Sequence, residues 1–175
     1  MAALKVAVSD ADHVQGLANA EITLVEYGDY ECPHCGRAYP IVKRVQKHFG
    51  KRLRFVFRNF PLGEMHPHAE GAAEAAEFCG AQGKFWEMHD LIYENQERLS
   101  GPLYLELAQK IGVAPAALRA SLEKREFLAR VKADFTGGVR SGVNGTPTFF
   151  INGLRHDGAF DYEDLVDAIE AAAPA

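Results

Sequence analysis

Alternating apolar and polar positions predict two strands in the first third of the chain. Residues 22–27 alternate β-branched and other apolar side chains, and residues 53–58 repeat the alternation before a proline. Between them, apolar residues recur at helical spacing from Cys35 to Phe49, and Gly50 is a natural stop for a helix. The order strand, helix, strand predicts a parallel pair joined by a right-handed crossover.

The pattern then changes to helices alone, from about residue 67 to residue 142. Strand signals return at residues 148–151, and Asn152-Gly153 favours a type I′ turn into residues 154–156. That hairpin makes this edge of the sheet antiparallel. A last helix follows Asp161, which can cap it.

This order of elements predicts an α/β protein with a mixed central sheet, flanking helices and an inserted helical domain. We place the sheet-forming domain at residues 1–62 and 143–175, and the helical insertion at residues 63–142. The 175 residues, of which 47% are hydrophobic and 25% charged, are typical of one globular domain with a substantial core.

The charge pattern and the N-terminus limit the expected partners and location. A net charge of -5 provides no broad basic field, so we expect neither nucleic acid nor an anionic membrane as a partner. The first ten residues carry no positive segment ahead of an apolar stretch, and no segment approaches the roughly 18 apolar residues of a membrane span. As written, the sequence predicts a cytoplasmic protein; a periplasmic domain whose leader had been removed would look the same.

The candidate chemistry lies in Cys32-Pro33-His34-Cys35, where two thiols at the start of a helix can close and reopen a small disulfide. Free N–H groups and the positive end of the helix dipole favour the thiolate of Cys32, which is therefore the predicted nucleophile. Pro33 suits the first helical turn, and a protonated His34 would place a positive charge beside the sulfur. A stabilised thiolate makes the disulfide easier to reduce, which predicts an oxidising pair.

The remaining cysteine and histidines have simpler interpretations. Cys79 lies on an Ala-rich helical face and is predicted to be a small buried residue rather than a redox centre. His66, His68 and His89 lack a fourth ligand with suitable spacing. We therefore predict no metal site and no cofactor.

Taken together, these residues resemble the DsbA-type disulfide oxidoreductases, in which a helical domain interrupts a thioredoxin fold. The resemblance covers nearly the whole chain and rests on residues 26–35, 82–86 and 142–147. The Pro-His pair between the cysteines is similar to the DsbA branch rather than to the Gly-Pro pair typical of thioredoxin. The resemblance implies a thioredoxin fold with an inserted all-helical domain.

The family also implies roles for residues outside the cysteine motif. Pro147 would be cis, with Thr146 beside the cysteines and its backbone free to pair with an extended substrate segment. The alternative is a trans proline that merely begins a strand. Glu26 matches a buried acidic group that would accept a proton from Cys35 directly or through water, and the alternative is a surface carboxylate.

The predicted function is thiol-disulfide exchange with thiol- or disulfide-containing proteins or peptides. A redox partner, glutathione or another oxidoreductase, would recharge the site, and the net direction stays open. Tyr30, Phe60 and Met65 are candidates for a peptide-contact surface, with ordinary packing as the alternative. The rival functions are a glutathione-dependent transferase or isomerase of the same fold, and a non-enzymatic zinc- or peptide-binding module.

Overall fold

The computed structural model describes residues 2–175 of the chain. The strands are β1 (His13–Gln15), β2 (Ile22–Gly28), β3 (Leu53–Asn59), β4 (Thr148–Ile151) and β5 (Leu154–His156). The helices are α1 (Pro33–Phe49), α2 (Ala69–Ala81), α3 (Phe85–Glu94), α4 (Gly101–Lys110), α5 (Pro115–Lys124), α6 (Leu128–Arg140) and α7 (Tyr162–Ala172). Two 3-10 turns, η1 (Gly50–Arg52) and η2 (Gln96–Arg98), complete the described elements.

Across the described residues, the strands form one five-stranded mixed sheet in the order β1-β3-β2-β4-β5. The central strands β2 and β3 are parallel, in register from Ile22 opposite Leu53 to Gly28 opposite Asn59, and α1 connects them. The other neighbouring pairs are antiparallel. The predicted order strand, helix, strand is confirmed, whereas the sequence analysis missed β1, whose three residues are too few to show a periodicity.

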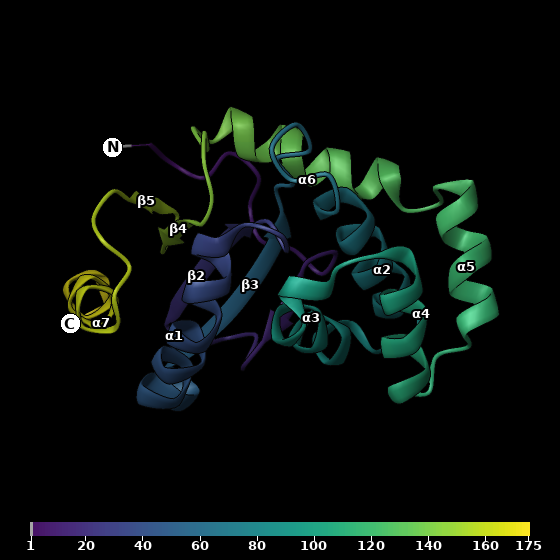
Figure 1. Ribbon diagram of the computed structural model, residues 1–175. Coiled ribbons are helices and arrows are strands. Elements are labelled where there is room, and N and C mark those ends of the chain that lie inside the picture. The colour runs from purple at the N-terminus through teal and green to yellow at the C-terminus, as the bar shows by residue number, and fades with distance from the viewer. Residues whose placement is uncertain (1) are drawn as a thin grey trace.

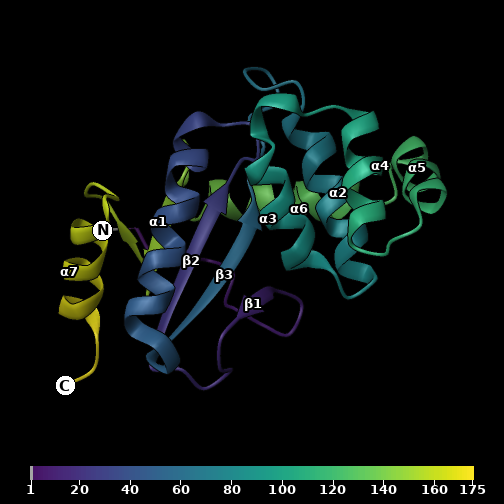
Figure 2. The same ribbon diagram turned by 60° about the horizontal axis from the view of Figure 1, so that its bottom comes forward.

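Helices cover both faces of the sheet (Figures 1 and 2). One face carries α1 and α7, whose inward residues Val45 and Leu165 join Leu24 and Phe55 in one hydrophobic cluster. The other face is covered by α6 and by the N-terminal segment, which pack against a second cluster that includes Val25. Both faces of β2 are buried, and all of its residues except the half-buried Thr23 are covered, the polar Glu26 among them.

The helices α2 to α5 lie beside the sheet, to the right in Figure 1. Their core is continuous with the core beneath α1, since Ala76, Met88 and Leu107 belong to the same hydrophobic cluster as the sheet residues. The predicted thioredoxin fold with an inserted helical region is confirmed by this arrangement. Within that predicted insertion, α6 packs on the sheet itself and leads into β4.

The C-terminal hairpin and helix follow the local signals with one exception. Asn152 and Gly153 have φ angles of 47° and 85°, the left-handed values that a type I′ turn requires. Asp161 occupies the N-cap position of α7, but its carboxylate makes no cap bond and instead accepts from Arg37 at 2.9 Å. The prediction placed Asp161 correctly at the N-cap position of α7. Its carboxylate, however, bonds to the Arg37 side chain on α1 rather than to the backbone of α7.

Gly138 allows α6 to approach the sheet closely. A Cβ atom there would lie 2.8 Å from the buried Phe60 ring and 3.0 Å from the Tyr27 ring. We expect Gly138→Ala to lower the free energy of unfolding by about 1 to 3 kcal/mol in urea titrations. The control Gly71→Ala, whose Cβ would lie an ordinary 3.6 Å from Tyr104, should be neutral or stabilising. Equal losses in both variants would contradict the close-approach explanation.

Candidate active site

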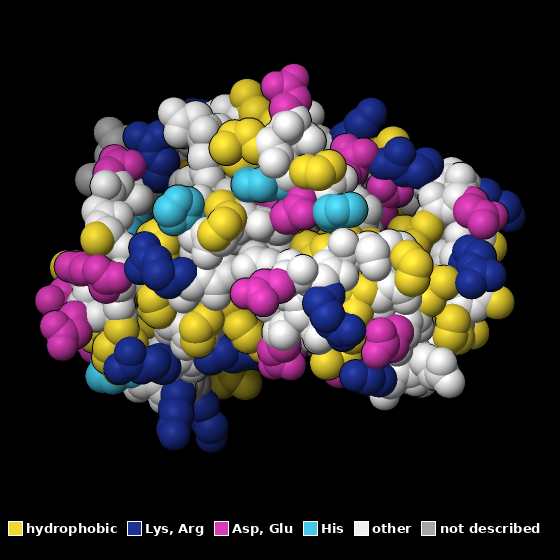
Figure 3. All heavy atoms as spheres, viewed as in Figure 1, with side chains coloured by type: hydrophobic (Ala, Val, Ile, Leu, Met, Phe, Trp, Pro, Cys, Tyr) yellow, Lys and Arg dark blue, Asp and Glu magenta, His cyan; other side chains and the backbone are white. Residues whose placement is uncertain are grey.

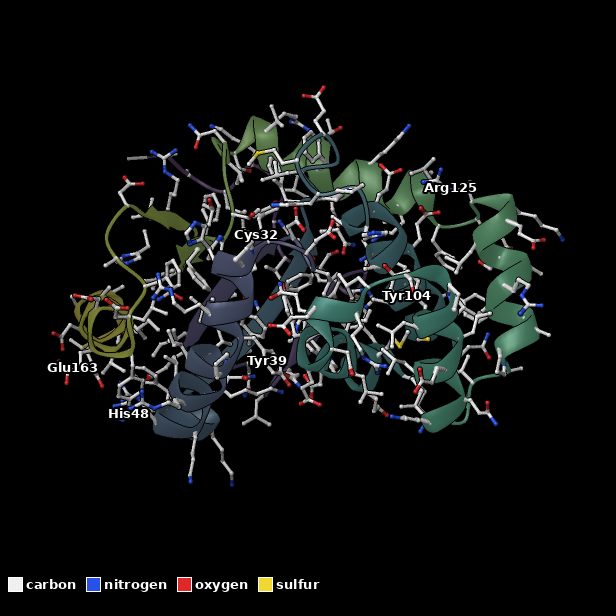
Figure 4. All side chains as sticks on the ribbon, viewed as in Figure 1. Cys32, Tyr39, His48, Tyr104, Arg125 and Glu163 are labelled. Carbon is white, nitrogen blue, oxygen red and sulfur yellow. The ribbon has the colours of Figure 1, made fainter. Side chains whose placement is uncertain are left out.

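The two cysteines of the motif lie at the N-terminal end of α1, where Figure 4 labels Cys32. Cys32 is the N-cap residue, and its carbonyl accepts from the Gly36 N–H at 3.0 Å, the first bond of the helical ladder. The two sulfurs are not joined by a disulfide here; Cys32 is 3% exposed and Cys35 is fully covered. A reacting partner can therefore reach Cys32 before it can reach Cys35.

The surroundings of Cys32 favour its thiolate and lower the pKa of the thiol to about 5. The largest cause is a hydrogen bond from the Cys35 thiol, and partial burial opposes it. The Thr146 side chain and the backbone N–H groups of Cys35 and His34 lower the pKa further. At neutral pH the sulfur is therefore almost entirely thiolate, and the helix N-terminus contributes to this through its N–H groups.

Cys35 is shifted in the opposite direction. Burial, its hydrogen bond with Cys32 and the nearby Glu26 carboxylate raise the pKa of Cys35 well above its ordinary value. The Asp29 N–H, which donates to the Cys35 sulfur at 3.4 Å, only partly offsets this. The pair thus consists of one thiolate and one thiol that holds its proton, which gives the two cysteines different chemical roles.

Glu26 lies on β2 beneath the motif and is only 3% exposed, which rules out a surface carboxylate. Burial, followed by the negative charge of Cys32, raises the pKa of Glu26 to about 8. Glu26 lines a small cavity of about 10 Å³, close to the volume that one water molecule needs. Tyr93, whose buried hydroxyl has no partner among residues 2–175, lines the same cavity. Glu26 therefore has both the position and the pKa to exchange a proton near neutral pH.

The segment before β4 lies against the cysteines although 114 residues separate it from the motif. The Thr146–Pro147 peptide bond is cis, as the family resemblance implies. The Thr146 carbonyl lies 3.6 Å from the Cys32 sulfur, and apart from its effect on that sulfur the buried Thr146 hydroxyl has no hydrogen-bond partner in the described chain. Substrate binding by Thr146 and Pro147 stays a prediction.

Pro33 and His34 are both exposed on the first turn of α1. Pro33 is the first residue of the helix, where its missing N–H leaves no hydrogen bond unmade. His34 acts on Cys32 through its backbone N–H. An additional effect of a charged His34 ring stays a prediction.

The sequence analysis missed Asp29, whose side chain is completely buried below the motif. One carboxylate oxygen accepts from the Glu31 and Cys32 N–H groups at 2.8 and 3.1 Å. The other accepts from the Leu62 N–H at 2.9 Å and from the His66 ring at 2.8 Å. Asp29 thereby ties the cysteine motif to the loop between β3 and α2. In the sequence, only its position between the strand and the cysteine motif sets Asp29 apart. That position does not indicate its bonds to Leu62 and His66.

The proposed apolar contact surface needs a correction. Tyr30 and Phe60 are 1% and 2% exposed and serve the core, whereas Met65 is 71% exposed on the loop that Asp29 holds. Figure 3 shows histidine and hydrophobic side chains intermingled across the upper part of this face, the region where Figure 4 places Cys32. Of the three candidates, Met65 alone is available to a partner.

The other predicted side chains take structural positions. Burial raises the pKa of Cys79 to about 12, so its covered thiol is a poor nucleophile. His89 is buried and bonds to the Tyr30 hydroxyl at 2.8 Å, while His66 bonds to Asp29. The described residues contain no group of three or more side chains arranged to hold a metal ion.

The fold and the paired thiols define a class of protein: a dithiol protein whose thioredoxin-type sheet is interrupted by a helical region. A family model described as "Thioredoxin" matches residues 8–171. The chain therefore belongs to the thioredoxin family. The resemblance to its DsbA-like members is also confirmed by the structural neighbours.

Two solved structures show the likeness at 28% identity. Oxidised BdbD from Bacillus subtilis has a TM-score of 0.83, with 90% of each chain covered. A thioredoxin-like oxidoreductase from Silicibacter pomeroyi has a TM-score of 0.81, with 94% of this chain and 93% of that chain covered. These neighbours support an enzyme of the oxidoreductase type.

The curated relatives carry a different name. A protein described as Na(+)/H(+) antiporter NhaA 1 from Salinispora arenicola is 44% identical over 163 residues, which are 93% of this chain and 25% of that protein. The chain thus spans about a quarter of the length of the curated relatives it matches. Among the helices of residues 2–175, none combines the length and apolar character needed to cross a bilayer. The antiporter name describes the whole of those relatives, of which this domain is one part.

The lowered pKa of Cys32 predicts how fast it is alkylated at different pH values. Because the thiolate is the reacting form, the rate should rise with pH and reach half its maximum near pH 5. Mass spectrometry of the digested protein, after timed iodoacetamide pulses from pH 3 to pH 9, would locate the label. Cys79 serves as the internal control and should remain almost unlabelled at pH 7. A midpoint near the ordinary value of about 8.5 would contradict the stabilised thiolate.

Proposed function

We propose that this protein is a thiol-disulfide oxidoreductase that exchanges disulfides with protein or peptide thiols through Cys32 and Cys35. The observation that carries the proposal is the geometry of the pair: Cys32 is the N-cap residue of α1 beside the Thr146 carbonyl, and Cys35 is fully covered one turn further along. This geometry favours a thiolate at Cys32 and a thiol at Cys35. A structural pair would not require this division, whereas an exchange centre does. The Cys32 sulfur must be both a good nucleophile and a good leaving group, whereas Cys35 must keep its proton until Cys32 has formed a mixed disulfide.

In the oxidising direction, the protein begins with a Cys32–Cys35 disulfide. A substrate thiolate attacks the Cys32 sulfur, a mixed disulfide forms, and Cys35 leaves with the electron pair of the broken bond. Cys35 then takes up a proton, for which protonated Glu26 is the nearby donor. A second substrate thiolate attacks the substrate sulfur and releases Cys32 as thiolate. The substrate has lost two electrons and the protein has gained them.

In the reducing direction the same steps run backward. The Cys32 thiolate attacks a substrate disulfide, one substrate thiolate leaves, and a mixed disulfide forms. Cys35 gives its proton to the Glu26 carboxylate and attacks the Cys32 sulfur, which releases the second substrate thiolate. The low pKa of Cys32 makes it a good leaving group and favours the reduced pair. The pool that recharges the pair, glutathione or another oxidoreductase, sets the net direction.

Substrate is proposed to bind beside Cys32 against the segment before β4. Thr146 and Pro147 offer backbone groups there, and the contact between the Thr146 carbonyl and the Cys32 sulfur places that backbone beside the reacting atom. Met65 adds an exposed apolar side chain on the opposite loop. An extended cysteine-containing segment of a partially folded protein fits this combination, because recognition would depend on backbone more than on sequence.

Replacing each cysteine separately tests the division of roles. Cys32→Ser should abolish turnover in an insulin-reduction assay, because the attacking sulfur is lost. Cys35→Ser should also stop turnover but accumulate mixed disulfides with substrate, visible by non-reducing electrophoresis and intact mass. The control Cys79→Ala should retain wild-type turnover, since the Cys79 thiol is buried and its pKa is raised to about 12. Turnover by Cys32→Ser would rule out the proposed nucleophile.

The Glu26 carboxylate should control the step in which Cys35 attacks the mixed disulfide. The rate of that step should rise with pH to a plateau, because only ionised Glu26 accepts the proton. Its midpoint should lie at or below about 8, since the mixed disulfide removes the Cys32 charge that helps to raise the Glu26 pKa. Glu26→Gln should slow the step by roughly 100-fold and remove this pH dependence. Stopped-flow release of a labelled peptide measures it; an unchanged profile in Glu26→Gln would exclude the role.

A further inference from the structure

Gln96, in the turn η2 of the helical insertion, reaches the backbone of the cysteine motif. Its side-chain nitrogen donates to the Cys32 carbonyl at 2.8 Å and to the Tyr30 carbonyl at 3.0 Å. More than sixty residues of chain separate Gln96 from both acceptors. Figure 2 shows the insertion beside the end of α1 at which the motif lies. A single amide group thus connects the insertion to the residue that carries the nucleophilic sulfur.

The opposite side of the same amide rests against α1. A Cβ atom at Gly36 would overlap the Gln96 side-chain oxygen, so glycine at this position provides the space that the amide occupies. The turn itself is held independently of these contacts, since the Asn95 side chain donates to the Leu91 carbonyl at 2.8 Å. The Gln96 amide is therefore held by the carbonyls of Tyr30 and Cys32 and packs against Gly36, while the Asn95–Leu91 bond holds its turn.

The hydrogen bond from Gln96 matters for the orientation of the Cys32–Pro33 peptide group. Because residue 33 is proline, this peptide has no N–H, and its orientation can be fixed by hydrogen bonds only through the Cys32 carbonyl. That oxygen accepts from Gly36 within the helix and from Gln96 outside it. The orientation of this peptide determines where the next N–H groups point, and those of His34 and Cys35 are the ones that favour the Cys32 thiolate.

We propose that Gln96 is a positioning residue through which the helical insertion sets the redox equilibrium of the Cys32–Cys35 pair. By holding the Cys32 carbonyl, Gln96 keeps the N–H groups of the first helical turn directed at the sulfur. It also supplies donors that offset the partial negative charge of that carbonyl beside a sulfur anion. Both effects stabilise the reduced, thiolate form over the disulfide. This inference rests on the proposed function and assigns part of the control of that site to the insertion.

The test uses Gln96→Leu, which keeps the volume of the side chain and removes both donors. The equilibrium between the dithiol and disulfide forms is measured against glutathione buffers by tryptophan fluorescence or acid-quenched mass. We expect the constant to shift about 3- to 10-fold toward the disulfide, the effect of one net hydrogen bond. The alkylation midpoint of Cys32 should move upward together with it. If the contact only supports the fold, Gln96→Leu would lower the free energy of unfolding and leave both the dithiol–disulfide equilibrium constant and the alkylation midpoint of Cys32 unchanged.

A second variant approaches the contact from α1. Gly36→Ala places a methyl group where the Gln96 amide lies, so the amide must move away and lose its bonds to the motif. Because alanine favours the helix, this variant should fold even if Gln96→Leu does not. It should shift the equilibrium in the same direction as Gln96→Leu. The matched control is Asn95→Ala, which weakens the same turn without a contact to the motif and should leave the equilibrium unchanged.

The outcomes separate this inference from the proposed function. Wild-type equilibrium constants in both Gln96→Leu and Gly36→Ala, alongside a wild-type protein that exchanges disulfides, would overturn the role of Gln96 and leave the function standing. An equal shift in Asn95→Ala would also overturn it, because the turn and not the amide would then be responsible. A wild-type protein that forms no Cys32–Cys35 disulfide with oxidised glutathione would overturn both.

Discussion

The unequal depth of two sulfurs on one helical turn is the constraint on which this site depends. Cys35 can donate to Cys32 only because burial and a neighbouring carboxylate hold its own proton in place. The thiolate at Cys32 and the thiol at Cys35 are thus two results of one arrangement. The helix N-terminus adds N–H groups toward the sulfur, but the division between the two cysteines comes from their difference in depth.

Three distant parts of the chain support this arrangement from different sides. Asp29 lies beneath the motif and binds the Cys32 N–H, the Thr146 carbonyl lies beside the sulfur, and Gln96 holds the Cys32 carbonyl from the insertion. Each contact fixes a backbone group of the motif or approaches its sulfur. The interrupted fold therefore places a helical domain where it can act on the redox pair, in addition to burying hydrophobic surface.

The groups that shift the pKa values of the two cysteine thiols lie within residues 26–146. Two kinds of relatives contain a stretch similar to this chain. The fold of BdbD from Bacillus subtilis corresponds to this chain over 90% of each, whereas the antiporter-named relatives contain a similar stretch as a quarter of their length.

The sequence by itself determined the order of strands and helices from β2 onward, the cysteine pair at a helix start and, through the family motif, the cis proline beside it. These are local properties, because hydrophobic period, turn residues and motif spacing act over a few positions. The partners of Asp29 and Asp161, the burial of Tyr30 and the contact of Gln96 with the motif were decided only by tertiary structure. Each of these features depends on which distant segment packs against the residue, and the neighbouring sequence contains no signal for such a long-range contact.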